Sequence, residues 1–368
     1  MTRLRPDTNL KLVRIFIRSL SRNQAVSQVK QDCQTGLHEP PNGCAMELTS
    51  LALRFRGQSN DVVDHVSLEA KSAEVLCIVG ESGCGKSVTA MALMGLLPQD
   101  SSIISSGNLK VGEDIFDLTR DTLPRAMRGS RIAMIFQEPM TSLNPAFRIG
   151  DQICEAIIQH SGATRPAARA RAEDMLQRVG IANPSQRLFE YPHQLSGGMR
   201  QRVMIAMALA NDPHVLIADE PTTALDVTIQ AQILDLIRDL RDATRMSTIM
   251  ITHDLGVVAE IADRIAVMYG GQVVEQGPVR EVFDNPQHPY TIGLMSAMPG
   301  LDRPGERLAI VPGTVPTIAN MPEGCRFRTR CAFAAATCAQ RPTLSEIAPQ
   351  HHVACHFAPL EEHIEVTR

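Results

Sequence analysis

The segment that most restricts the fold of this chain is VLCIVGESGCGKS, residues 75–87. Its five leading apolar residues predict a buried strand, and the helical periodicity of residues 87–97 predicts a helix that follows at once. Between the two, Gly80, Gly83 and Gly85 let the backbone curl so that its N–H groups face one concavity, which the positive end of the helix extends. A strand, a glycine-rich loop and a helix in this order predict an anion site in an α/β domain.

The side chains of this loop suit the phosphates of a nucleotide. Lys86 can reach the β- and γ-phosphates, and the Ser87 hydroxyl can ligate Mg²⁺. Cys84 fills a position for a small residue and is not expected to act in redox chemistry. The alternative, a glycine-rich turn without a ligand, is disfavoured by the strand and helix on either side. We expect a nucleotide to contact eight consecutive residues: Gly80, Glu81, Ser82, Gly83, Cys84, Gly85, Lys86 and Ser87.

The rest of the chain alternates short apolar runs with helical patterns, which predicts a mostly parallel sheet covered by helices. At 368 residues, 44% hydrophobic and 21% charged, the composition is typical of a soluble globular protein. Because no apolar run is long enough to span a bilayer, no transmembrane helix is expected. The net charge of −4 argues against a nucleic-acid partner. The apolar runs are residues 75–79, 132–136, 215–218, 248–252 and 265–269, and the helical patterns are 87–97, 167–179, 199–210 and 228–242.

The charge is unevenly distributed along the chain. Residues 1–30 carry seven basic side chains and one acid, a local charge of +6, so the remainder carries −10. Residues 10–22 combine apolar residues at helical period with a basic face, a pattern typical of a helix on an anionic membrane surface. A poorly ordered tail, or upstream sequence if translation starts at Met46, is the favoured interpretation. We therefore expect residues 1–45 to be a disordered basic extension with a linker around 32–46.

Two further motifs carry chemistry. VLIADEPTTALD, residues 215–226, is an apolar strand that ends in Asp219 and Glu220. Asp219 can hold the hydration shell of Mg²⁺, and Glu220 can polarise an attacking water as a general base. LSGGMRQR, residues 195–202, is a second glycine-containing turn that opens a helix and so forms a second anion site. Because the chain has two such surfaces but one phosphate loop, the second surface is expected to serve a nucleotide held by another subunit.

With these motifs the chain resembles the ATP-binding cassette (ABC) ATPases over about residues 47–285. The resemblance implies an α/β P-loop NTPase fold with a RecA-like parallel-sheet core, an antiparallel β subdomain and a helical subdomain. It also implies two cassettes that enclose two ATP molecules head to tail. The signature that completes the partner's site would be Leu195, Ser196, Gly197 and Gly198.

The same resemblance implies roles for residues that have no strong motif of their own. Gln137 would be the Q-loop glutamine, which contacts the metal or water, and His253 the switch histidine at the γ-phosphate. Asp226 would be the D-loop aspartate that communicates across the dimer. Phe55, 25 residues before Gly80, would stack on adenine. The Mg²⁺ ligands would then be Ser87, Gln137 and Asp219.

Two stretches resemble the bacterial dipeptide/oligopeptide/nickel importers in particular. They are QEPMTSLNPAFRIGDQICEAI at 137–157 and NPQHPYTIGLMSAMP at 285–299. This resemblance implies a nucleotide-binding domain at 46–285 and an importer-type C-terminal region at 286–368. The implied partners are a second, different cassette subunit, two transmembrane permeases and a solute-binding protein, at the cytoplasmic face of the inner membrane.

The transported solute stays open at this point. A peptide is favoured, and nickel, glutathione or another solute is the alternative. A soluble ABC ATPase of the translation or repair type is the runner-up. It is less favoured because such proteins typically carry two cassettes or a long coiled coil.

Four of the nine cysteines lie close together near the C-terminus, in the spacing C-x5-C-x6-C-x16-C. Four thiolates in a reducing compartment suit zinc or an iron–sulfur cluster. The C-terminal regions of the importer group can hold a [4Fe–4S] cluster, and this resemblance favours the cluster over zinc. The alternative is four unligated structural cysteines. The four are Cys325, Cys331, Cys338 and Cys355.

Overall fold

The computed structural model describes residues 43–137, 142–223, 226–297, 311 and 313–360. The basic segment 1–42 therefore lies outside the described residues, as do parts of the 137–157 and 285–299 stretches. No helix within the described ranges is long and apolar enough to cross a membrane.

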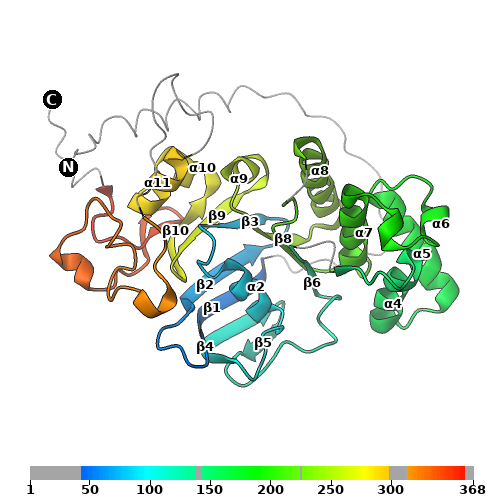
Figure 1. Ribbon diagram of the computed structural model, residues 1–368, viewed down its shortest axis with the longest axis horizontal. Coiled ribbons are helices and arrows are strands. Elements are labelled where there is room, and N and C mark those ends of the chain that lie inside the picture. The colour runs from blue at the N-terminus through cyan, green and yellow to red at the C-terminus, as the bar shows by residue number, and fades with distance from the viewer. Residues whose placement is uncertain (1–42, 138–141, 224–225, 298–310, 312, 361–368) are drawn as a thin grey trace.

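The centre of the molecule is a sheet of eight strands in the order β11-β12-β10-β9-β3-β8-β7-β6 (Figure 1). The five strands from β9 to β6 run parallel, and β10, β12 and β11 extend the sheet as an antiparallel edge. The bounds are β3 Val75–Val79, β6 Ile132–Ile135, β7 Val215–Asp219, β8 Ser247–Ile251, β9 Arg264–Tyr269, β10 Gln272–Pro278, β11 Ser345–Ala348 and β12 His351–Val353.

The parallel sheet predicted from the apolar runs is confirmed. Every residue of β3, β7 and β8 is buried, as expected of parallel strands that are covered on both faces. Alternate residues enter two different cores: Cys77 of β3 packs with the helical side, and Ile78 packs with the second sheet.

A second, antiparallel sheet of order β2-β1-β4-β5 covers one face of this core. Its first strand begins at Cys44, so the last residues of the expected linker lie in the strand, where Met46 pairs with Ala70 and Val111. The strands are β1 Cys44–Phe55, β2 Val63–Lys71, β4 Ser102–Val111 and β5 Asp114–Asp117.

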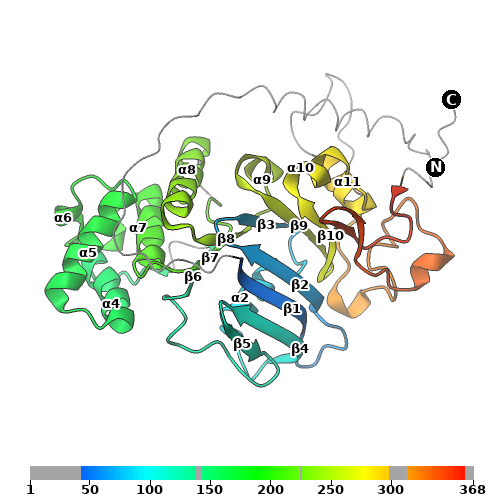
Figure 2. The same ribbon diagram turned by 180° about the vertical axis from the view of Figure 1, so that it is seen from behind.

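The helices divide between the sheet and a separate helical part. Helices α4 to α7 lie at one end of the molecule. Helices α8, α9, α10 and α11 lie on the face of the eight-stranded sheet that the antiparallel sheet does not cover (Figures 1 and 2). Helix α2 ends at Leu93, earlier than its periodicity predicts, because the chain turns at Gly95 with φ of 60°. The bounds are α2 Lys86–Leu93, α4 Ile149–Ser161, α5 Arg165–Arg178, α6 Pro184–Arg187, α7 Gly197–Leu209, α8 Val227–Thr244, α9 Leu255–Ile261, α10 Val279–Asp284 and α11 Pro289–Ser296.

The C-terminal region lies at the opposite end from α4–α7 and is joined to the cassette by buried polar contacts (Figure 1). Strand β12 pairs with β10, and the buried carboxylate of Glu275 on β10 contacts His351 at 2.8 Å. The same carboxylate accepts the backbone N–H groups of Gln287 and His288. Asp64 of β2 pairs with two arginines of this region, Arg326 and Arg341, each at 2.8 Å.

Candidate active site

The carboxyl ends of neighbouring parallel strands bring the predicted site residues together. Strands β3, β8, β7 and β6 lie side by side, so the residues that follow them meet at one edge of the sheet. Gly80 follows β3, Gln137 follows β6 and Glu220 follows β7, while His253 lies just beyond the end of β8. The topology thus assembles the site from four separate segments.

The phosphate loop needs glycine for two different physical reasons. A Cβ on Gly80 would lie 2.2 Å from the carbonyl oxygen of Met268 on β9, and the residue has φ of 152°. At Gly85 a Cβ would lie 3.0 Å from the carbonyl of Val62. Gly83 instead faces open space at φ of 81°, so its requirement is the left-handed backbone. The loop is packed tightly on one side and open on the other.

Lys86 places a buried positive charge in this loop. It is only 6% exposed, and its ammonium group donates to the carbonyl oxygens of Gly80 at 2.7 Å and Glu81 at 3.1 Å. These acceptors orient the side chain without neutralising it. A buried ammonium in a loop of backbone N–H groups fits an anionic phosphate.

Ser87 and Asp219 form a pair of oxygen donors beside the loop. The Ser87 hydroxyl donates to Oδ1 of Asp219 at 3.2 Å. Burial raises the pKa of Asp219, and the nearby charge of Glu220 adds to the effect, while the Ser87 hydrogen bond opposes it. A hydroxyl and a desolvated carboxylate are ligands that Mg²⁺ prefers, so the donor set fits this ion.

Glu220 is the point at which the other site residues converge. Its Oε2 accepts from Gln137 Nε2 at 3.0 Å and from Thr223 Oγ1 at 2.8 Å, and its Oε1 lies 3.2 Å from Nδ1 of His253. Burial alone would raise the pKa of this carboxyl, but the Thr223 and His253 hydrogen bonds and the charge of Lys86 outweigh it and lower the pKa. Glu220 is therefore ionised at neutral pH and can accept a proton.

Sequence reasoning missed two residues that support Glu220. Thr223 bonds to the carboxylate, and the buried Gln201 on α7 donates to the carbonyl of Pro221 at 2.6 Å. Thr223 lies within the 215–226 motif, so a local capping pattern could have indicated it. Gln201 could not be found in this way, because its contact depends on how α7 packs against the end of β7.

The second glycine-containing turn opens α7 as predicted and faces outward. Ser196 is the N-cap residue, and its hydroxyl accepts from the backbone N–H of Met199 at 3.3 Å. Leu195 is buried and anchors the turn, while Ser196 and Gly197 are exposed. A Cβ on Gly197 would meet no atom within 4 Å. The helix end and the space before it are thus available to a ligand brought by another molecule.

The remaining predicted residues lie at the margins of the site. Phe55 is the last residue of β1 and is half-buried. Asp226 is the N-cap of α8, where its side chain accepts from the N–H of Ile229 at 3.0 Å. Gly198, behind the α7 turn, would place a Cβ 3.1 Å from the side chain of Ile229, so α7 and α8 are in close contact there.

The four C-terminal cysteines come together but do not form a site for a single metal ion. Burial, and to a smaller extent the other thiols of the group, raises the pKa of Cys331 to about 12 and that of Cys355 to about 11. Among the described residues, no group of three or more His, Cys, Asp or Glu side chains could hold a metal ion. Within the described residues the structure therefore supports neither the favoured iron–sulfur cluster nor the zinc alternative at these cysteines. All four are free thiols: Cys325, Cys331, Cys338 and Cys355.

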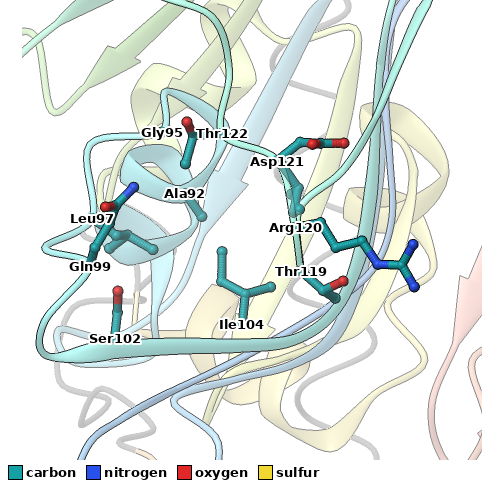
Figure 3. Close-up of a pocket in the computed structure, with 11 residues that line it drawn as sticks. Ala92, Gly95, Leu97, Gln99, Ser102, Ile104, Thr119, Arg120, Asp121 and Thr122 are labelled. Atoms are coloured by element: carbon teal, nitrogen blue, oxygen red, sulfur yellow. The ribbon is translucent and has the colours of Figure 1, made fainter.

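A pocket of about 190 Å³ lies at the opposite end of α2 from the phosphate loop (Figure 3). Leu97 and Gln99 line one side of it, and Arg120 and Asp121 line the other. No predicted nucleotide contact lines this pocket. Ser82 and Gly83 leave one side of the phosphate loop exposed, as expected when a second subunit must cover the nucleotide.

The fold and this set of residues define an ATP-binding cassette. The family model of the ABC transporter matches residues 63–223, and that of the oligopeptide/dipeptide transporter C-terminal region matches residues 274–338. The chain belongs to the ABC transporter ATPases, and within them to the group that carries this C-terminal region.

Relatives and solved structures agree with this assignment. The chain is 50% identical over 303 residues, 82% of its length and 91% of the relative's, to a Brucella abortus protein named as a peptide import ATP-binding protein. A Brucella melitensis protein of the same description is 47% identical over 84% of this chain and 96% of its own. Among structures, cbiO1 of the ABC transporter complex cbiONQ from Clostridium perfringens has a TM-score of 0.56 at 27% identity, covering 66% of this chain and 91% of that one. The dimeric cassette MJ0796 bound to ADP and Pi has a TM-score of 0.55 at 27% identity, covering 64% and 99%.

Proposed function

We propose that this chain is the ATP-hydrolysing subunit of a bacterial importer that takes up dipeptides or oligopeptides through separate permease subunits. The convergence of Gln137, Thr223 and His253 on the ionised Glu220, beside the Lys86 loop, carries the ATPase part of the proposal. The names of the relatives and the C-terminal family model support the peptide part.

In the proposed mechanism, Lys86 and the loop N–H groups hold the phosphates of ATP. Ser87, Asp219 and Gln137 would hold Mg²⁺, and the ion would supply positive charge against that developing on the phosphates. Glu220 accepts a proton from the attacking water, and Thr223 and His253 keep its carboxylate oriented towards that water. The lowered pKa of Glu220 ensures that it is charged when the water arrives.

The turn at 195–198 completes the site of a second cassette subunit. Ser196 and Gly197 present the exposed N-terminal end of α7, whose dipole favours the γ-phosphate of a nucleotide held by the partner. Asp226 lies at the start of α8, beside this turn, and would transmit the closure of the dimer from one subunit to the other. Two ATP molecules would then close the dimer, and hydrolysis would reopen it.

We further infer that the dimer works with two permeases and a solute-binding protein at the cytoplasmic face of the inner membrane. Phe136 and Phe147, 43% and 56% exposed, flank the segment that follows β6. Exposed aromatic side chains suit contact with a permease segment, and Phe136 directly precedes Gln137 in the chain. The resemblance of residues 137–157 to the importer group supports the same surface.

The test of this proposal begins with the neighbouring genes: two permeases, a solute-binding protein and a second cassette are expected. Co-expressed with these partners and placed in proteoliposomes, the chain should hydrolyse ATP and take up labelled dipeptides. Uptake of nickel or glutathione, but not of peptides, would assign the transported solute to another class. The ATPase assignment would be unaffected. ATP hydrolysis with no permease gene beside this gene and no solute uptake would instead favour a non-transport ABC ATPase.

A [4Fe–4S] cluster at the four C-terminal cysteines stays a prediction from the family resemblance. Anaerobic purification followed by iron, sulfide and zinc analysis tests it. Colourless protein without metal would show that the four cysteines are unligated.

A further inference from the structure

Two residues of the C-terminal region, Arg330 and Tyr290, contact Glu81 of the phosphate loop. The side chain of Arg330 contacts both carboxylate oxygens of Glu81, at 3.0 and 3.1 Å. The hydroxyl of Tyr290 accepts the backbone N–H of the same residue at 2.8 Å. These partners lie 249 and 209 positions away in the sequence, so the contact exists only in the folded chain.

Arg330 is held in place from several sides. Its side chain is 6% exposed and also donates to the carbonyl of Gly313 at 3.1 Å and to the hydroxyl of Tyr269 at 3.5 Å. Its guanidinium lies 5.6 Å from the ring of Tyr269 and 5.9 Å from that of Phe327. A single guanidinium nitrogen, Nη1, thus contacts both carboxylate oxygens of Glu81, while Nη2 donates to the backbone carbonyl of Gly313 and holds the group in place.

Tyr290 is equally fixed. It is fully buried on α11, and its ring lies 4.8 Å from Tyr269 and 5.5 Å from Phe327. The carbonyl of Glu81 in turn accepts from Lys86 at 3.1 Å. The amide, the carbonyl and the carboxylate of Glu81 therefore each have a defined partner, two of which come from beyond residue 285.

The charge of Glu81 makes this arrangement significant for nucleotide binding. Glu81 is the second residue of the loop, and its side chain is 30% exposed. An unpaired carboxylate here would repel the phosphates of ATP, because like charges interact strongly where water is partly excluded. Paired with Arg330, the carboxylate is neutralised and turned towards the C-terminal region.

We propose that Arg330, supported by Tyr290, is a positioning residue for ATP binding, which holds the Glu81 carboxylate away from the phosphates and neutralises its charge. The inference rests on the phosphate loop being the nucleotide site, as proposed above. It gives the C-terminal region a role in ATP affinity. Arg330 acts through Glu81 and does not itself contact the reacting atoms.

The experiment measures the Kd of the full chain for mant-ATP with Mg²⁺ and the KM and kcat of its ATPase. Arg330→Ala should raise Kd and KM about 10-fold and leave kcat within about twofold, because binding and not hydrolysis is affected. Adding Glu81→Gln to Arg330→Ala should restore Kd to within about threefold of the unaltered chain, since the repelling charge is gone.

Arg341→Ala is the matched control, because Arg341 also joins the C-terminal region to the cassette but pairs with Asp64. It should leave Kd within about twofold. Arg330→Ala with unchanged Kd, or with a loss that Glu81→Gln does not relieve, would overturn the proposal. If the unaltered chain did not bind mant-ATP, the nucleotide-site assignment itself would fail.

Discussion

At the residue scale, Glu220 has a backbone conformation that few residues adopt. Its φ is 45°, in the left-handed region, immediately after the buried end of β7. Such conformations cost free energy and persist where the surrounding structure holds them. Here the Glu220 N–H donates to the carbonyl of Ile251 on β8, and the Thr223 N–H donates to the Glu220 carbonyl. The strained backbone points the carboxylate at Gln137 and His253.

Glu220→Gln should abolish hydrolysis while ATP binding persists. A general base typically contributes about 10²–10⁴-fold, so turnover should fall by at least about 100-fold. The amide keeps the size of the side chain but cannot accept the proton. Steady-state ATPase and mant-ATP binding measure the two effects separately. A Glu220→Gln protein that retained most of its turnover would rule out the assigned role, and Thr223→Val is the graded control that removes one hydrogen bond.

His288 predicts a pH dependence of stability. It is fully buried, and burial lowers its pKa from 6.5 to about 3. Its Nδ1 accepts the N–H of Tyr290 at 3.0 Å, so the folded state needs the neutral ring. The unfolded chain takes up the proton first as pH falls. This contribution to stability is therefore complete above about pH 6.5 and is lost as pH falls towards 3.

The expected size is about 1.4 kcal/mol per pH unit within that window. The free energy of unfolding is measured with urea at pH 7 and at pH 5. The difference between the two values should be about 2 kcal/mol smaller for His288→Gln than for the unaltered chain. His356→Gln, at an exposed position, should leave the difference unchanged. Equal pH dependence in all three chains would contradict the neutral, buried state of His288.

At the scale of elements, α7 combines a buried face with a free N-terminal end. Val203, Ile205 and Ala206 are fully buried, while Ser196 and Gly197 at the start of the helix are exposed. The helix thus belongs to the core of its own chain, and its positive end faces outward. This separation of folding from ligand contact can be tested at a single position.

Gly197→Ala should leave the fold intact and impair hydrolysis. A Cβ at Gly197 meets nothing within 4 Å, and alanine is the better helix former by about 1 kcal/mol, so thermal stability should be equal or higher. The same methyl group would occupy the space that a partner's nucleotide needs, and ATPase activity should fall about 10-fold or more. Thermal melting and ATPase assays check both parts. Unchanged activity would contradict the role of this helix end.

At the scale of the whole molecule, the proposed function gives each chain two separate halves of a nucleotide site. The phosphate loop and Glu220 lie at the carboxyl ends of the sheet, whereas the α7 turn lies towards the helical end (Figure 2). A dimer related by a twofold axis would join the loop of each chain to the turn of the other. The open surface of the loop in a single chain is consistent with this assembly.

ATP should therefore drive association. With Mg²⁺ and ATP, Glu220→Gln should form a dimer in light scattering, with a mass near twice 40.2 kDa, either alone or with the second cassette from the same gene cluster. The mixture that dimerises identifies the native pairing. Combining Glu220→Gln with Gly197→Ala should weaken the association. A chain that binds ATP but associates with neither partner would contradict the composite site.

The sequence predicted the parts of this protein that depend on neighbouring residues. The order of strands and helices, the phosphate loop, the acids after β7 and the turn before α7 are encoded by local periodicity and by glycine at set positions. The helical stretch 87–97 was too long by several residues, because helix ends depend on turns such as that at Gly95. Gln201 was missed because its contact depends on how α7 packs against the end of β7, whereas Thr223 lies within the 215–226 motif and could have been indicated locally.

What the sequence by itself determined is which residues can bind phosphates, activate water and begin helices, because those properties belong to short segments. Only the tertiary structure decided that Gln137 and His253 contact Glu220. It also decided that Arg330 and Tyr290 bind Glu81. Those contacts join strands and regions far apart in the chain. They depend on how the sheet, its helices and the C-terminal region pack together, which no local pattern records.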